Sequence, residues 1–492
     1  MVYYKVEKMP KARIDICPKE TTMRKTKIIC TVGPACSDEA TLEQMLLAGM
    51  NVARLNFSHG THEDHLEHIK SIKKIREKLD MPIAVMLDTK GPEYRIKTFE
   101  NHKIDLKDGA TFTFTTNDVI GNEERVSVNY QGLAGELDVG DTILLNNGLL
   151  SFRVTAIDGN DIVCKVVDGG VLSDRKSMSF PGKVLSQPYL SEQDKCDLLF
   201  GIENDIDFIA CSFVSCKQDL LDVHEFLDAN GGDHISLIAK IENRAGIDNI
   251  DDICSACDGI MIGRGDMGVE IPFEEVPAIQ KQLITKCRLL GKRVITATEM
   301  LESMIHNPRP TRAEISDVAN AVYDGTSAIM LSGETAAGEH PVLAVKTMAR
   351  IAAKTEESIN YKKRFLTSEF KIKNTLDAMS HSICSLSIDI DAKAIVVCSL
   401  SGMTARMVSR FRSPVDIIGL CVNERTWRQL SLSFGVTPVL CELYPSVEVL
   451  FYTAKRMAAK TFRLKREDKI IISGGDTNGK SGNTNLIKIE TI

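Results

Sequence analysis

Eight short, continuous runs of apolar residues recur along the first two-thirds of the chain, and helical patterns separate most of them. Runs this short and this apolar are typical of strands that are buried on both faces, as in a parallel sheet. Eight parallel strands close into a barrel when helices connect them. The sequence therefore predicts an α/β fold built on a (β/α)8 TIM barrel, with strands at residues 27–32, 52–56, 83–88, 208–213, 235–241, 259–263, 294–298 and 328–332.

Two stretches depart from this pattern. Between the third and fourth runs, alternating segments such as TFTFTT and RVSVNY are separated by DG, GD and GG turns, which predicts an antiparallel β-barrel lid domain. After the eighth run, helices and strands alternate again, which predicts a separate α/β sandwich. We expect an N-terminal segment (1–24), a catalytic barrel (25–90 and 187–356), the inserted lid (91–186) and a C-terminal regulatory domain (357–492).

Composition excludes several classes of protein. Sixty basic residues against 67 acidic residues leave a formal net charge of −7, which offers nothing to nucleic acid or to an anionic membrane. No apolar run reaches the length of about 20 residues that a transmembrane helix needs. Fourteen cysteines, many inside apolar runs, are typical of free thiols in a reducing compartment, so we expect a cytoplasmic protein.

Polar and charged residues stand where the apolar runs end. In a (β/α)8 barrel, catalytic groups lie at the carboxyl ends of the strands. Packing alone does not require carboxylates, cations and hydroxyls together on one rim, so this cluster indicates chemistry. The rim residues are Arg54, Asn56, Ser58, His59, Asp88, Thr89, Lys90, Ser212, Lys240, Glu242, Gly263, Arg264, Gly265, Asp266, Thr298, Ser332 and Glu334.

The spacing of three rim residues points to a divalent cation. Lys240 and Glu242 are two apart in a strand, so their side chains point the same way. Asp266 ends the neighbouring strand, where its oxygens and those of Glu242 can share Mg²⁺ or Mn²⁺. The alternative is structural, namely a Lys240–Glu242 ion pair beside a satisfied Asp266.

A metal, a lysine and an arginine in one pocket suit a substrate with carboxylate and phosphate groups. Phosphoryl transfer requires the protein mainly to position reactants and to neutralise charge. We expect Lys240 to stabilise the transferring group and an enolate left behind, and Thr298 and Ser332 to pass a proton to that enolate through water. Two alternatives remain: a metal-dependent lyase or aldolase, and a non-catalytic paralogue that senses sugar phosphates.

Long motifs along almost the whole chain resemble pyruvate kinase. They include TKIICTVGPACS, MNVARLNFSHG, MLDTKGPEYR, IAKIENRAGIDN, DGIMIGRGDMGVEIP, VITATEMLESM and SGNTNLIKI, in the order of that family. The resemblance implies phosphoryl transfer from phosphoenolpyruvate to ADP, giving pyruvate and ATP, with Mg²⁺ and K⁺ as cofactors. It also implies a homotetramer.

The resemblance assigns roles residue by residue. Glu242 and Asp266 match ligands of the divalent metal. Lys240 and Arg54 match residues beside the phosphoryl group, and Gly265 and Thr298 match positions that bind the substrate carboxylate. Asn56, Ser58, Asp88 and Thr89 match potassium ligands. Positions that contact the nucleotide are matched by Asn56, His59, Arg95 and Lys176.

Some positions near the site follow the family pattern for potassium-using members, whereas others depart from it, as Ile96 does where a threonine is usual. Glu93 stands where relatives without potassium carry a lysine, which favours potassium activation here. Gly263 replaces an alanine before the Arg264-Gly265-Asp266 motif, and Asn146 and Asn147 occupy a lid turn that often carries acids.

The C-terminal domain carries a candidate effector site. Ser399, Ser401, Gly402 and Thr404 link a strand to a helix N-terminus, where amides and hydroxyls bind anions. The resemblance implies a sugar-phosphate or nucleotide effector, although Leu400 stands where bisphosphate-activated relatives often carry a lysine. The alternative is a helix cap with no ligand.

Overall fold

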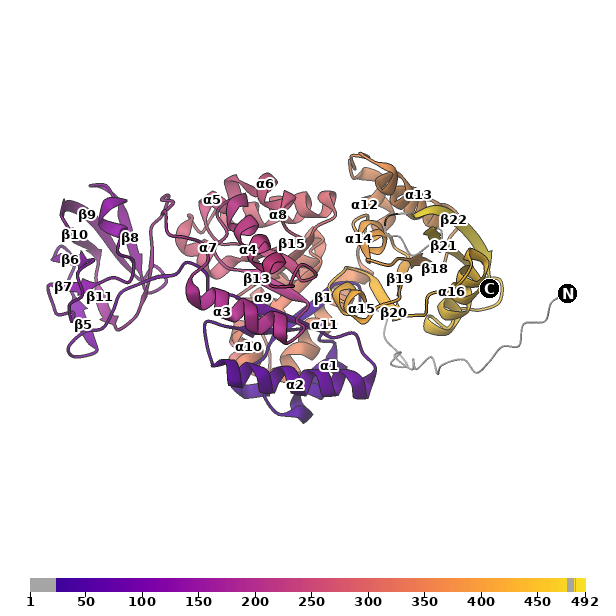
Figure 1. Ribbon diagram of the computed structural model, residues 1–492, viewed down its shortest axis with the longest axis horizontal. Helices are drawn as coiled ribbons and strands as arrows, with labels where there is room; N and C mark the ends of the chain where they lie inside the picture. Colours follow the sequence, from indigo (N-terminus) through magenta and orange to yellow (C-terminus); the bar gives the residue numbers. More distant parts are fainter. Residues whose placement is uncertain (1–23, 476–481, 483) are drawn as a thin grey trace.

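The computed structural model describes residues 24–475, 482 and 484–492 of the chain. Three bodies follow one another along its long axis (Figure 1). A β-rich body contains β4 to β12, the barrel occupies the middle, and an α/β body contains α13 to β22. The sequence also predicts a glycine-rich loop at residues 473–485 that closes over the effector site, and residues 476–481 and 483 of it lie outside the described residues.

The central body is a closed barrel of eight parallel strands, as predicted. The largest difference from the predicted bounds is at β13, which ends at Cys211 rather than at residue 213. In barrel order the strands are β1 (Lys27–Thr31), β17 (Ala328–Leu331), β16 (Arg293–Ala297), β15 (Gly259–Gly263), β14 (Ser236–Ile241), β13 (Phe208–Cys211), β3 (Ala84–Asp88) and β2 (Val52–Asn56).

Strand alternation divides the barrel residues between two cores. Residues such as Val52, Met86 and Ile238 fill the interior, whereas their neighbours Ala53 and Val85 pack against the outer helices. Leu432 of the C-terminal body is fully buried in the interior cluster, so this body closes one end of the barrel. The other end therefore carries the open rim.

The barrel helices have local start signals. Thr61 and Ser191 form capping boxes at the starts of α2 and α3, because each accepts a hydrogen bond from the third helical residue. The helices around the barrel are α1 (Glu39–Ala48), α2 (His62–Leu79), α3 (Glu192–Glu203), α4 (Lys217–Ala229), α5 (Arg244–Asp248), α6 (Ile250–Ser255), α7 (Arg264–Glu270), α8 (Val276–Leu290), α9 (Arg312–Asp324), α10 (Gly333–Ala336) and α11 (Pro341–Glu357). The next helix, α12 (Tyr361–Thr367), lies with the C-terminal body, where Phe365 packs into the core (Figure 1).

The inserted body is a β domain with its own core of buried aliphatic and phenylalanine side chains. It contains a seven-stranded sheet, in the order β4-β12-β8-β9-β10-β6-β7, and a two-stranded sheet, β11-β5. Its pairing is antiparallel except for β6 and β7, which run parallel. Its strands are β4 (Tyr94–Arg95), β5 (Lys103–Leu106), β6 (Thr111–Thr115), β7 (Arg125–Ser127), β8 (Thr142–Leu145), β9 (Leu150–Asp158), β10 (Asp161–Asp168), β11 (Gly170–Ser173) and β12 (Ser177–Ser179).

The turn between β8 and β9 explains its two asparagines. Asn146 and Asn147 have φ values of 53° and 57°. This left-handed region is unfavourable for most side chains but is well tolerated by asparagine. Asparagine at both positions therefore fits the left-handed backbone conformation of this turn.

The C-terminal body is a five-stranded sheet in the order β20-β19-β18-β21-β22, with helices on both faces. Its pairings are parallel except for β21 with β22. The elements are α13 (Thr375–Asp389), β18 (Ala394–Cys398), α14 (Met403–Ser409), β19 (Asp416–Cys421), α15 (Glu424–Leu430), β20 (Val436–Leu440), α16 (Val447–Thr461), β21 (Lys469–Gly475) and β22 (Thr484–Thr491).

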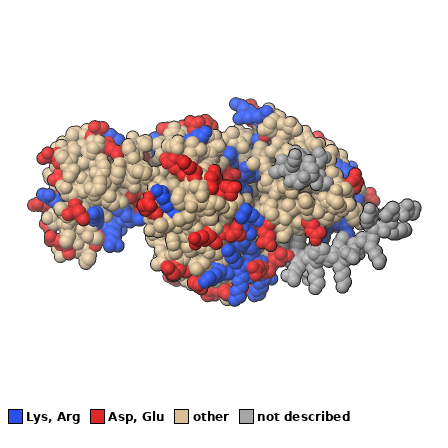
Figure 2. All heavy atoms as spheres, in the orientation of Figure 1, with Lys and Arg blue, Asp and Glu red and all other residues tan. Residues whose placement is uncertain are grey.

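Basic and acidic side chains are interspersed on the face drawn in Figure 2. Every cysteine among the described residues is a free thiol. Within the same residues, no helix is both long and apolar enough to cross a membrane.

Candidate active site

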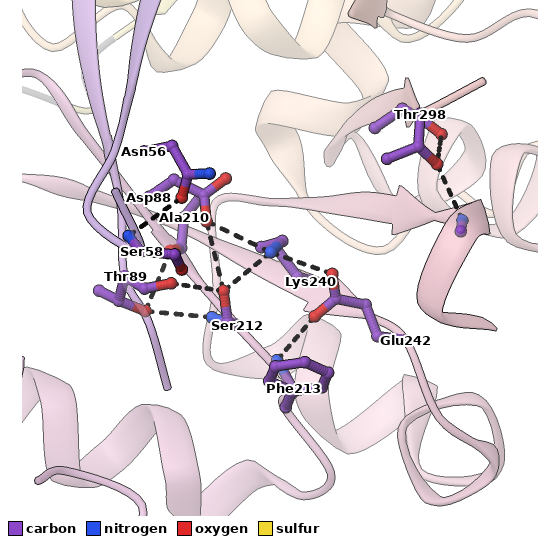
Figure 3. A network of polar contacts seen from close by, with 12 residues as sticks. Asn56, Ser58, Asp88, Thr89, Ala210, Ser212, Phe213, Lys240, Glu242 and Thr298 are labelled. Atoms are coloured by element: carbon purple, nitrogen blue, oxygen red, sulfur yellow. Dashed lines mark hydrogen bonds and ion pairs between the residues drawn. The ribbon is translucent and has the colours of Figure 1, made fainter. Parts of the chain in front are cut away.

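Lys240 is the centre of a polar network at the carboxyl end of the barrel (Figure 3). Its Nζ lies 2.8 Å from the Ser212 hydroxyl, 3.2 Å from Asp88 Oδ1 and 3.0 Å from Glu242 Oε1. Burial lowers the pKa of Lys240, but the fields of Asp88 and Glu242 outweigh burial and raise it above its usual value. Lys240 is therefore a fixed positive charge at the rim.

Glu242 is buried beside this lysine and close to a second carboxylate. Its Oε2 accepts a hydrogen bond of 2.9 Å from the Phe213 backbone amide. Burial raises the pKa of Glu242 to about 7; Lys240 opposes this shift, whereas Asp266 adds to it. Asp266, in the first turn of α7, is exposed. Two mutually repelling carboxylates, one buried and one open to solvent, are a donor set that fits a small divalent cation.

Gly263 gives Glu242 its space. A Cβ at position 263 would lie 2.6 Å from Glu242 Oε1, too close for the observed position of that side chain. Glycine at position 263, where the family usually has alanine, therefore leaves room for the Glu242 carboxylate in this position.

Arg54 is held at the same rim by Asp88 and Thr31. Its Nε contacts Asp88 Oδ2 at 2.5 Å, and its Nη1 donates to the Thr31 hydroxyl at 2.9 Å. Burial raises the pKa of Asp88, but Arg54 and Lys240 outweigh burial and lower it below its usual value. Asp88 is therefore held as a carboxylate that pairs with both Arg54 and Lys240.

The four predicted potassium ligands come from the ends of two adjacent strands. The Asn56 side-chain oxygen accepts from the Ser58 amide at 3.2 Å, and Asp88 pairs with Asn56 in the register of β2 and β3. The Thr89 carbonyl accepts from the Ser212 hydroxyl at 2.6 Å. The structure brings these oxygen-bearing groups together in Figure 3.

Thr298 and Gly265 meet at the junction of β16 and α7. The Gly265 amide donates to Thr298 Oγ1 at 2.9 Å. Thr298 Oγ1 donates to the Ala297 carbonyl at 2.6 Å. Ser332 has a buried hydroxyl with no hydrogen-bond partner among the described residues, and its amide donates to Glu334.

The predicted nucleotide residues lie on two bodies. His59 follows β2 of the barrel, and its carbonyl accepts from His65 at 3.0 Å. Arg95 and Lys176 belong to adjacent strand segments of the inserted body, where Ile96 donates its amide to the Lys176 carbonyl at 3.1 Å. Arg95 is also paired with Glu93.

The predicted effector residues surround the start of α14. Gly402 caps this helix with a φ of 74°, and a Cβ there would meet Thr426 Cγ2 at 3.0 Å. The Ser399 amide is engaged with the Leu420 carbonyl at 2.9 Å. Thr404 and Thr484 share a hydrogen bond of 2.8 Å between their hydroxyls. Ser401 is exposed in the loop between β18 and α14.

Several supporting groups received no role from the sequence. Ser212 was identified only as a rim residue, although it contacts Lys240, Asp88 and Thr89. Phe213 carries its amide to Glu242 because its φ of 56° turns the chain sharply. In the sequence, the only sign of these two roles is a polar residue, Ser212, at the end of a predicted strand.

Metal sites built from larger clusters are absent from the described residues. In this part of the chain, no three His, Cys, Asp or Glu side chains are grouped to hold an ion. The Glu242–Asp266 pair falls below that number, as expected where substrate and water oxygens complete the coordination of Mg²⁺.

Comparison with known proteins agrees with this arrangement. Residues 23–345 match the pyruvate kinase barrel domain, and residues 377–490 match the pyruvate kinase alpha/beta domain. The chain belongs to the pyruvate kinase family. Its reaction is therefore phosphoryl transfer from phosphoenolpyruvate to ADP, giving pyruvate and ATP, and the lyase and non-catalytic alternatives are set aside.

Individual pyruvate kinases are similar over nearly the whole chain. The enzyme of Bacillus licheniformis is 47% identical over 473 residues, covering 96% of this chain and 81% of that protein. The enzyme of Clostridium acetobutylicum is 42% identical, covering 96% and 100%. A crystal structure of the Cryptosporidium parvum pyruvate kinase superposes with a TM-score of 0.91 at 38% identity, covering 95% and 96%. Pyruvate kinases generally use Mg²⁺ and K⁺.

Proposed function

We propose that Lys240 is the catalytic residue that stabilises the phosphoryl group during its transfer. The observation that carries this proposal is the position of its Nζ, 3.2 Å from Asp88 and 3.0 Å from Glu242. These carboxylates keep the ammonium charged and fixed before substrate binds. A preorganised cation is worth most where charge develops in the transition state. Arg54, fixed by Asp88, supplies the second cation for the phosphate oxygens.

Glu242 and Asp266 are the residues that would hold Mg²⁺ or Mn²⁺. Burial raises the pKa of Glu242 and the charge of Asp266 adds to that shift, so a divalent cation bound between the two carboxylates would relieve their repulsion. When bound, the metal supplies Lewis-acid charge stabilisation to carbonyl and phosphoryl oxygens. Asn56, Ser58, Asp88 and, through its backbone carbonyl, Thr89 would hold K⁺, which adds positive charge beside the phosphoryl group.

Thr298 and Gly265 would bind the substrate carboxylate through a hydroxyl and a backbone amide. The hydrogen bond between these two groups in the substrate-free protein holds both donors at one place. Thr298 and Ser332 would then relay a proton to the enolate through water. The Ser332 hydroxyl has no hydrogen-bond partner in the described part of the chain, which is consistent with a group that hydrogen-bonds to water or ligand.

The remaining assignments concern binding and assembly. Asn56, His59, Arg95 and Lys176 would contact the nucleotide, with Arg95 and Lys176 brought over the rim by the lid (91–186). Ser399, Ser401, Gly402 and Thr404 would receive a sugar-phosphate or nucleotide effector in the regulatory domain (357–492). We further propose a cytoplasmic homotetramer whose catalytic barrel comprises residues 25–90 and 187–356.

A steady-state assay tests these assignments together. Pyruvate release from phosphoenolpyruvate and ADP is measured while Mg²⁺ and K⁺ are varied independently, with sugar phosphates and AMP added in turn. We expect strict dependence on the divalent cation and strong activation by K⁺. Full activity without added K⁺ would contradict the monovalent site.

A further inference from the structure

The chain leaves β16 through a turn with an unusual backbone. Thr298 and Glu299 are consecutive residues with φ values of 65° and 53°. Neither is a glycine, and a β-branched side chain is particularly unfavourable in this left-handed region. Such a conformation persists only where surrounding contacts determine it. The turn points the Thr298 hydroxyl at the Gly265 amide, so its shape sets the position of that hydroxyl.

One side chain provides most of these contacts. The guanidinium of Arg264 donates through Nε to the carbonyls of Ala297 and Thr298, both at 3.2 Å. Its Nη2 donates to the Thr298 carbonyl and, at 3.0 Å, to the Glu299 carbonyl. A single planar fork thus binds three successive carbonyls. A lysine ammonium has no comparable fork.

The guanidinium is itself fixed from the opposite side. Its Nη1 pairs with Asp317 of α9 at 2.6 Å, and only 10% of the Arg264 side chain is exposed. Asp317 is the carboxylate that compensates this largely buried charge. Arg264 therefore connects α9 to the turn, with one edge on the carboxylate and the other on the carbonyls.

We propose that Arg264 is a positioning residue, which holds the turn so that the Thr298 hydroxyl and the Gly265 amide face the substrate carboxylate and the enolate. This inference rests on the proposed role of Thr298. Arg264 reaches the Thr298 hydroxyl through the backbone of the turn, and the hydrogen bonds of its guanidinium among the described residues do not include Glu242, Lys240 or Asp88. Loss of the fork should therefore affect proton transfer and substrate orientation, and it should spare metal binding.

The variant Arg264→Lys tests the proposal in the full-length protein. It keeps a cation beside Asp317 but removes the fork. We measure the exchange of pyruvate methyl protons with deuterium by NMR in the presence of Mg²⁺, K⁺ and ATP. We expect a rate lowered about 100-fold, the size of effect that a misplacement of about 1 Å produces. Binding of Mn²⁺, followed by electron paramagnetic resonance, should change less than about twofold.

A double variant shows whether Arg264 acts through Thr298. If it does, Thr298→Ala/Arg264→Lys exchanges protons no more slowly than Thr298→Ala alone, because the hydroxyl is already absent. If the double variant instead lowers the exchange rate by the product of the two separate factors, the inference is overturned. If Thr298→Ala alone exchanges at the wild-type rate, the proposed role of Thr298 fails, and this inference with it. If Arg264→Lys exchanges protons at the wild-type rate while Thr298→Ala exchanges them slowly, the positioning role of Arg264 is wrong and the role of Thr298 stands.

Two further variants separate positioning from loss of structure. Glu299 is exposed, and glycine adopts positive φ without strain, so Glu299→Gly in the Arg264→Lys background should recover at least about threefold of the exchange rate. Absence of recovery would overturn the strained-turn account. Arg412→Lys is the matched control, because Arg412 also binds backbone carbonyls, those of Gly325 and Ser409, away from the rim. It should lower the melting temperature and leave proton exchange unchanged; slowed exchange in this control would count against the proposal.

Discussion

The two ends of the barrel are both rich in buried ionic side chains, but the charges are arranged differently. At the amino end, Asp207 and Asp258 precede β13 and β15, and each pairs at 2.7 Å with an arginine of the C-terminal body, Arg428 and Arg406. At the carboxyl end, Asp88 and Glu242 both contact the ammonium of Lys240, and Asp88 also pairs with Arg54, a residue of the barrel itself.

The two ends differ in the source of the positive charge that balances their carboxylates. At the amino end, Arg428 reaches both Asp207 and Asp205, and the backbone amide of Val85 also donates to Asp207. Burial raises the pKa of Asp207 here too, but the counter-charges of this end come from the C-terminal body, so its ion pairs join the two bodies. At the carboxyl end, Glu242 has a pKa raised by burial to about 7, and Asp266 increases it further. This end has capacity for additional positive charge, which ligands bring.

The largest effect should follow from removing the cation at the carboxyl end. Lys240→Met leaves Glu242 and Asp266, the proposed metal ligands, in place but deletes the fixed charge that we propose lies beside the phosphoryl group. We expect phosphoryl transfer to fall at least about 1,000-fold, at the upper end of the cost of losing one preorganised group. Proton exchange of pyruvate should be largely retained, because the metal ligands remain. Coupled assay and NMR exchange measure the two steps, and full retained transfer would show the assignment of Lys240 to be wrong.

At the amino end, loss of a cation should affect stability instead of catalysis. Arg428→Met leaves Asp207, which is fully buried, without its main partner. Breaking a buried pair from one side costs about 3–5 kcal/mol, so we expect a clear fall in the first unfolding transition. Activity per folded molecule should stay within about twofold of wild type.

Arg425 provides the matched control for this variant. Its side chain is 41% exposed and lies 3.4 Å from Asp205, so Arg425→Met should cost less than about 1 kcal/mol. Calorimetry and guanidinium unfolding compare the two variants. Equal destabilisation by both would contradict the distinction between a buried and an exposed pair.

A smaller effect should follow from withholding the monovalent cation at the carboxyl end. Replacement of K⁺ by tetramethylammonium removes one positive charge near the phosphoryl group, and kcat should fall about 100-fold. The stability of the amino end should not change, since its ion pairs are internal. Titration of K⁺ back into the assay should restore the rate, and a failure to do so would indicate that Asn56, Ser58, Asp88 and Thr89 do not form the site.

The sequence was sufficient for the barrel and for most of the rim. Continuous apolar runs such as residues 259–263 are local signals, and their ends identify residues such as Asp266 without any knowledge of contacts. The amino end was not predictable, because Leu432 and Arg428 meet the barrel from a distant part of the chain. The role of Arg264 was also hidden, because its carbonyl partners depend on the φ angles of a turn that no residue type announces.

The smallest effect concerns a carboxyl group at the edge of the carboxyl end. Glu270 ends α7 and accepts hydrogen bonds from the Ser179 hydroxyl and the Phe180 amide of the segment that leaves the inserted body. Burial raises the pKa of Glu270 from 4.5 to about 7. The folded state therefore keeps a proton that the unfolded state loses above pH 4.5, and stability falls as the pH rises through about 7.

Glu270→Gln removes this titration and leaves a neutral side chain of similar size. Between pH 5 and 8.5 the wild-type protein should lose stability on the order of 1 kcal/mol relative to the variant, because partial exposure of the carboxyl group weakens the effect. Melting temperatures of both proteins across this range measure the difference. Glu275→Gln changes an exposed glutamate paired with Arg244, and its melting temperature should vary with pH in the same way as that of the wild type. Parallel curves for Glu270→Gln as well would mean that the carboxyl end holds its charge as completely as the amino end does, and the contrast between them would be lost.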